Sequence, residues 1–89
     1  MNQIVTNRIG YQYEISPISD HETRISLFDL PHKSITIPYG IDEVMRAWYK
    51  WINGHFIQDA FWFLSEDDRE FLMSGLSASE FKELYSDDK

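Results

Sequence analysis

The spacing of apolar residues along the chain changes once, at residues 38–40. Before this point apolar and polar residues alternate in short runs, as at residues 11–15, which is typical of half-buried β-strands. After it the apolar residues are three or four positions apart, which indicates an amphipathic helix. The pattern therefore predicts an α+β fold, with a small antiparallel sheet of three or four strands followed by three or four short helices.

The first part of the chain contains four predicted strands, at residues 2–9, 11–15, 23–28 and 34–37. Pro17 and several turn-forming residues predict that residues 16–22 form a loop. Strands that follow each other closely in sequence usually pair with their neighbours. An antiparallel meander is thus the simplest topology.

The second part contains the predicted helices. The first covers residues 41–52, and Asn53 and Gly54 provide residues suited to its C-terminus. A second is predicted over residues 56–63, with Phe56, Ile57, Ala60, Phe61 and Leu64 as its apolar set. Ser65 and Ser77 are predicted N-caps of a third helix, closed by Gly75, and of a fourth that ends near Tyr85. Residues 86–89 are predicted to fray.

The composition indicates a single domain with a packed core. Residues 1–89 are 43% hydrophobic and 16% aromatic and contain no cysteine. Their β-rich part is residues 1–38 and their helical part residues 41–85. The absence of cysteine excludes disulfides, thiolate zinc sites and cysteine nucleophiles. No signal peptide or membrane-spanning run is apparent, so we expect a soluble cytoplasmic protein with no membrane partner.

The charge is acidic and unevenly distributed. The net charge is −7, and residues 1–40 have four acids and three bases, whereas residues 41–89 have eleven acids and five bases. An acidic surface repels phosphate, which argues against direct binding of nucleic acid. It favours a protein partner with a basic surface.

Candidate chemistry is sparse. His55 and Asp59 are four residues apart, but two ligands do not make a metal site, and no other histidine completes one. The acids of residues 66–70 have a sufficient explanation in the helix macrodipole. The four glycines form no phosphate-binding loop, and no serine lies in a nucleophile elbow. We therefore expect no enzymatic activity, no cofactor and no bound metal.

The aromatic residues of the helical part divide into two groups. Trp48, Trp51, Phe61 and Phe71 have helical spacing and are predicted core residues. Tyr49 and Trp62 fall off the apolar stripe, and Trp62 fits either the core or a contact surface ringed by acids. The candidate partner-binding residues are Tyr49, Asp59, Trp62, Glu66, Asp67, Asp68 and Glu70.

Residues 48–85 resemble a motif of small phage-encoded proteins. The resemblance rests on a tryptophan and a glycine, an Ile-Gln pair, an Ala-Phe pair, an Arg-Glu-Phe-Leu run and a Ser-Gly stop, here Trp51, Gly54, Ile57-Gln58, Ala60-Phe61, residues 69–72 and Ser74-Gly75. Trp62 replaces an expected proline and Phe81 an expected tryptophan. These phage proteins are uncharacterised, so the resemblance implies an accessory protein of a phage in its host cell and no established activity. By analogy with other small, acidic, cysteine-free phage proteins, we expect an inhibitor of host defence such as an anti-CRISPR protein.

Two main hypotheses follow. In the first, the protein is a non-enzymatic inhibitor that binds a host or phage protein through its aromatic anchor and its acids. In the second, it is a structural or regulatory homo-oligomer, for example a homodimer, in which Trp48, Tyr49 and Trp62 pack across a two-fold axis. A small enzyme or metal protein is a third, less favoured hypothesis.

Overall fold

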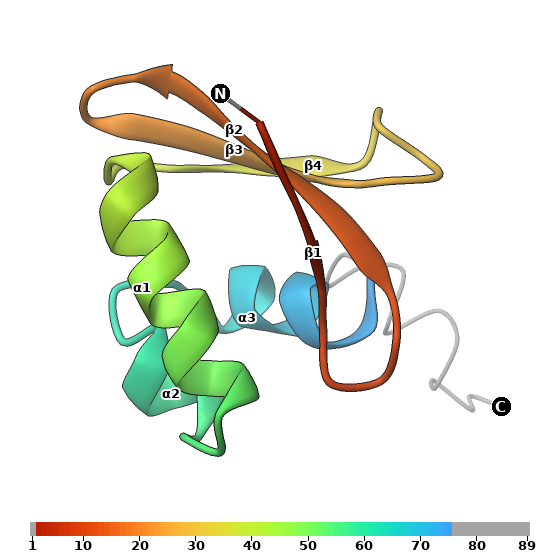
Figure 1. Cartoon of the computed structure of the whole chain (residues 1–89), viewed down its shortest axis with the longest axis vertical. Helices are drawn as coiled ribbons and strands as arrows, with labels where there is room; N and C mark the ends of the chain where they lie inside the picture. The colour runs from red at the N-terminus through yellow and green to blue at the C-terminus, as the bar shows by residue number, and fades with distance from the viewer. Residues whose placement is uncertain (1, 76–89) are drawn as a thin grey trace, which may run out of the picture.

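The computed structural model describes residues 2–75, which form four strands followed by three helices (Figure 1). The elements are β1 (Gln3–Thr6), β2 (Gln12–Ser19), β3 (Glu22–Leu27), β4 (Ser34–Ile37), α1 (Ile41–Ile52), α2 (Ile57–Ala60) and α3 (Glu66–Ser74). The strands pair in the order β1-β2-β3-β4, and every neighbouring pair is antiparallel. The predicted α+β class and the meander topology are confirmed.

The predicted loop at residues 16–22 is wrong, because β2 continues through Pro17 to Ser19 and β3 begins at Glu22. Proline is tolerated here because the pairing of β1 with β2 extends only to Ile15, whereas Pro17 is paired with Thr23 of β3. Odd-numbered residues of β2 direct their backbone groups toward β1, so the missing N–H of Pro17 removes no bond to β3. The register shifts between Pro17 and Ser19.

The two faces of the sheet have different environments. The helices lie on one face (Figure 1), and there Tyr13, Ile15, Ile25 and Ile37 are completely buried. The alternate residues of the strands lie on the other face, where most are exposed and polar. This alternation is the usual consequence of covering an antiparallel sheet on one side.

The first helix is confirmed at both ends. α1 buries Val44, Ala47, Trp48 and Trp51, has two acids in its first turn, and ends at the C-cap Asn53. Its start approaches the turn between β2 and β3 closely. A Cβ atom at Gly40 would lie 2.6 Å from the carbonyl oxygen of Asp20, so only glycine fits there.

The second helix is much shorter than predicted, and Phe56 does not belong to its buried side. α2 has four residues and ends at Ala60, and Phe56 is its exposed N-cap. The segment that follows is not helical, which allows Phe61 and Leu64 to enter the core while Trp62 between them faces solvent. Helical spacing therefore predicted which residues are buried, except for Phe56, but did not predict where the helix ends.

The third helix follows local capping rules. The Ser65 hydroxyl accepts a hydrogen bond from the Asp68 N–H at 3.2 Å, as the predicted N-cap requires. Gly75 ends α3 in the left-handed conformation with φ of 75°. The predicted fourth helix at residues 77–85 and the tail at 86–89 lie outside the described residues.

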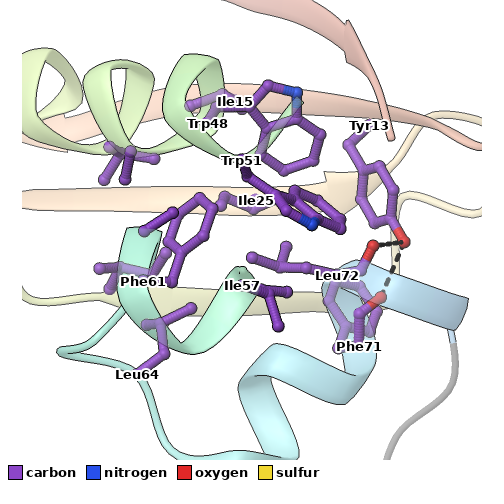
Figure 2. Close-up of a cluster of buried hydrophobic side chains, with 14 residues drawn as sticks. Tyr13, Ile15, Ile25, Trp48, Trp51, Ile57, Phe61, Leu64, Phe71 and Leu72 are labelled. Carbon is purple, nitrogen blue, oxygen red and sulfur yellow. Dashed lines mark hydrogen bonds between the residues drawn. The ribbon is translucent and has the colours of Figure 1, made fainter. Parts of the chain in front are cut away.

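The core lies between the sheet and the helices. Figure 2 shows the indole rings of Trp48 and Trp51 packed beside Phe61 and Tyr13. The Tyr13 hydroxyl donates to the carbonyl oxygens of Phe71 and Leu72, at 2.7 and 2.9 Å, and so links β2 to α3. The prediction that Trp48, Trp51, Phe61 and Phe71 are core residues is confirmed.

Candidate protein-binding surface

Trp62 is an exposed aromatic side chain that is held by other rings. It lies in the segment between α2 and α3, with 69% of its surface exposed. Its ring meets Phe63 edge-on at 5.5 Å between centroids and Tyr39 at 6.5 Å. The rings of Tyr39 and Phe63 also contact each other, with 4.4 Å between their centroids. These contacts restrict the ring before any partner binds, which lowers the entropy cost of binding.

Buried neighbours fix the position of Trp62. Phe61 on one side is completely buried, and Leu64 on the other side is 6% exposed. Because both of these residues enter the core, the backbone between them turns Trp62 outward. The sequence left open whether Trp62 belongs to the core or to the surface, and the structure places it on the surface.

Tyr49 is exposed but lies apart from the rings around Trp62. It is on α1, with 54% of its surface exposed, directly after the buried Trp48. Within residues 2–75, Trp62 has ring contacts with Tyr39 and Phe63 and none with Tyr49. The structure therefore does not bring the two candidate aromatic residues into one ring cluster.

The candidate acids have different environments. Asp59, Glu66 and Asp67 are exposed, and each is within five residues of Trp62 in sequence. Asp68 and Glu70 are half-buried, and the Glu70 carboxylate accepts a hydrogen bond from the Ser74 hydroxyl at 3.3 Å. Asp59, Glu66 and Asp67 are thus the candidate acids most accessible to a partner.

The pKa of the Asp68 carboxyl gives a testable pH dependence. Burial and then the charge of Asp67 raise this pKa above its ordinary value of 3.8, although the hydrogen bond with Ser65 lowers it. The folded state therefore binds this proton more tightly than the unfolded chain does. This contribution favours folding at low pH and is lost as the pH rises through the folded-state pKa.

We expect the free energy of unfolding of the wild type, relative to that of Asp68→Asn, to be larger at about pH 3 than at about pH 7. Asparagine cannot ionise, so the variant lacks this contribution while keeping a similar shape. Urea unfolding followed by circular dichroism at both pH values measures the difference. A difference that is constant with pH would contradict the raised pKa.

Two further aromatic residues are relevant to this surface but are not among those predicted from the sequence to bind a partner. Tyr39 follows β4 and supports Trp62, but only the folded chain brings residues 39 and 62 together. Phe56, with 69% of its surface exposed, lies beside a cavity of about 380 Å³. This cavity is lined by Arg8, Ile9, Trp51, Phe56, Ile57, Gln58 and Met73.

A second cavity of about 530 Å³ includes Tyr11, Leu27 and Leu30 in its wall, together with Gly75, the last described residue, and we assign it no ligand. Among residues 2–75 no three His, Asp or Glu side chains form a group suited to a metal ion. None of the helices described has the length and apolar character needed to cross a bilayer.

The structure corrects one part of the homodimer hypothesis. Trp48 is completely buried, with its ring against Tyr13, Trp51 and Phe61. It therefore cannot contact a second subunit without unfolding of the core. Tyr49 and Trp62 are accessible to such a contact.

No known protein family, curated protein or solved structure is significantly similar to this chain.

Proposed function

We propose that the protein is a phage accessory protein that acts by binding another protein and not by catalysis. Its target is a host or phage protein with a basic surface, such as a nucleic-acid-handling defence complex in the host cytoplasm, which it inhibits in the manner of an anti-CRISPR protein. The phage origin rests on the motif resemblance of residues 48–85. The binding role rests mainly on one observation, the exposed and ring-supported Trp62.

The aromatic anchor is the first part of the argument. Tryptophan is enriched among the residues that dominate binding energy, particularly where polar groups surround it. Trp62 has such neighbours in sequence, since Asp59 and Glu66 are exposed and within four residues of it. A side chain already restricted by Tyr39 and Phe63 loses less freedom on binding than a free one does.

Charge is the second part of the argument. The exposed acids Glu66 and Asp67 occupy the first turn of α3, in the part of the chain that has most of the net charge of −7. Acids near an anchor speed the encounter with a basic surface, and their effect weakens as salt is added. A basic partner is therefore the best match to this surface.

We expect Trp62→Ala to weaken partner binding at least tenfold, as truncation of a central tryptophan does. The tagged protein would first be used to capture partners from a bacterial lysate at about 0.1 to 1 M salt, with identification by mass spectrometry. Affinity for the identified partner would then be measured by calorimetry. Phe56→Ala is the matched control, because Phe56 is an aromatic residue with the same exposed fraction of 69% outside the Trp62 ring cluster. Equal losses in the two variants would contradict a specific anchor.

The role of the acids is tested by charge reversal in the same assay. Glu66→Lys with Asp67→Lys should slow association and reduce its dependence on salt. The matched control is Asp42→Lys with Glu43→Lys, which reverses two exposed acids in the first turn of α1 and has a similar helix-dipole cost. If both double variants retain wild-type association rates, charge steering is excluded.

A structural or regulatory homo-oligomer with no role against host defence is the second candidate function. Its supporting observation is the exposure of Tyr49 and Trp62, which are accessible to a second subunit. If the oligomer forms through these two residues, the double variant Tyr49→Ala with Trp62→Ala would lose self-association.

A further inference from the structure

The sheet has an edge whose outward-facing backbone groups have no partner in the part of the chain that the structure describes. β4 is the last strand in the order β1-β2-β3-β4, so only β3 pairs with it among residues 2–75. The N–H of Leu27 donates to the carbonyl oxygen of Lys33 at 3.0 Å, which fixes the hydrogen-bonding phase of the β3–β4 pair. In this phase Ser34 and Thr36 direct their backbone N–H and C=O groups away from β3.

The opposite edge of the sheet is different. On β1 the outward-facing carbonyl oxygen of Thr6 accepts a hydrogen bond from the Trp48 indole at 3.4 Å, so α1 partly covers this edge. On β4 no described residue forms a hydrogen bond with the outward-facing groups of Ser34 and Thr36. β4 is therefore the more open of the two edges.

The composition of β4 does not oppose pairing with an identical strand. Its residues, Ser-Ile-Thr-Ile, contain no charge, no proline and no bulge, although the strand has only four residues and is flanked by Lys33 and Pro38. The part of the chain that forms the sheet, residues 1–40, has four acids and three bases. Two copies thus meet with little repulsion at β4, whereas contact through the acidic helical part places like charges together.

We propose that a second copy of this chain pairs with β4 in an antiparallel manner and extends the sheet across a two-fold axis. Centred on Ile35, this axis pairs Ser34 with Thr36 of the partner subunit, and Thr36 with Ser34 of the partner subunit. Each such pair exchanges two backbone hydrogen bonds. Ile35, which is half-buried, meets Ile35 of the partner subunit on the face that packs against the helices.

The proposed pairing uses backbone groups of β4 and not the Trp62 side chain, and the interface is small. Four residues on each side bury much less than the 1,200–2,000 Å² of a standard interface. We therefore expect a weak dimer with a dissociation constant of about 10 µM to 1 mM. Sedimentation equilibrium should show the average mass rising from the 10.6 kDa monomer toward twice that value with concentration. A constant 10.6 kDa across this range would overturn the proposal.

Charged variants test the location of the contact. Ser34→Lys with Thr36→Lys places like charges opposite each other across the axis and should give a monomer, as should Ser34→Glu with Thr36→Glu. An equimolar mixture of the two should recover a dimer, because each lysine then faces a glutamate. Both side chains are exposed on the open face, so the fold tolerates the changes.

Two controls separate this contact from the others. Gln12→Lys with Ser16→Lys adds the same charge to the same face, but on β2 in the interior of the sheet, and should leave dimerisation unchanged. Trp62→Ala should also leave it unchanged, so that loss of partner binding and loss of dimerisation are distinguishable. Dimerisation that persists in the lysine variant, or is lost in Trp62→Ala alone, would overturn pairing at β4.

Discussion

Trp48→Ala is expected to lower the free energy of unfolding by about 3–5 kcal/mol, the range for removal of a large aromatic side chain from a core. Trp48 is completely buried and contacts Tyr13, Trp51 and Phe61, with ring centroids 5.5, 5.2 and 6.1 Å away. Alanine leaves a cavity at this junction and removes the indole donor to Thr6. Small domains have only about 5–15 kcal/mol of stability, and at the low end of this range the variant would keep only about 0–2 kcal/mol and be partly unfolded.

Tyr49→Ala is the matched control, since it removes an aromatic ring from the next residue of the same helix. Tyr49 is exposed, and surface substitutions of this kind change stability by about 0.5 kcal/mol or less. Urea unfolding followed by tryptophan fluorescence and circular dichroism measures both variants. Similar losses in the two would show that the burial of α1 is assigned to the wrong face.

Asn7→Ala is expected to cost about 2–3 kcal/mol, because it leaves several polar groups without partners at once. The Asn7 side chain is buried, and its oxygen accepts hydrogen bonds from the N–H groups of Ile9 and Tyr11, at 3.1 and 2.8 Å. Its Nδ2 group donates to the carbonyl oxygens of Leu72 and Met73, at 2.9 and 3.2 Å. One amide thus organises the turn after β1 and attaches it to the end of α3.

The control for this change is Asn2→Ala. Asn2 is exposed and forms one hydrogen bond, from its Nδ2 group to the Glu14 carboxylate at 2.7 Å. It should change the free energy of unfolding by about 0.5 kcal/mol or less. Chemical denaturation compares the two variants, and an Asn7→Ala protein as stable as Asn2→Ala would mean that the buried amide bonds contribute little.

Rules that depend on neighbouring residues were sufficient to predict the ends of α1 and α3. The acids and the Asn-Gly pair around α1, and the Ser65 and Gly75 caps of α3, are signals that depend on neighbouring residues only. Burial of the main aromatic residues also followed from spacing alone. These features could be predicted because each depends on the backbone within one or two turns of helix.

Features that depend on distant partners could not be predicted. Pro17 is acceptable in β2 only because β1 stops short of it, and the sequence does not show where that pairing ends. The ring contact between Tyr39 and Trp62 joins residues that are 23 positions apart in the sequence. Phe56 fits a helical stripe in sequence, but α2 begins only at Ile57, and Phe56 is its N-cap with an extended backbone. The sequence also left open whether Trp62 lies in the core or on the surface, because this depends on how the folded chain places distant residues.

The bonds that join the β1–β2 region to α3 also determine the order in which the chain can complete its fold. Tyr13 and Asn7 reach carbonyl groups 58 and 65 residues further along the chain. At synthesis rates of about 5–20 residues per second, a ribosome needs about 3–13 s to add those 65 residues after Asn7. During this interval α1 and α2 are synthesised and can cover part of the apolar face of the strands, but the hydrogen bonds to α3 cannot yet form. The hydrogen bonds of Asn7 and Tyr13 therefore cannot form until residues 71–73 are synthesised, although both residues lie in the part of the chain that is synthesised first.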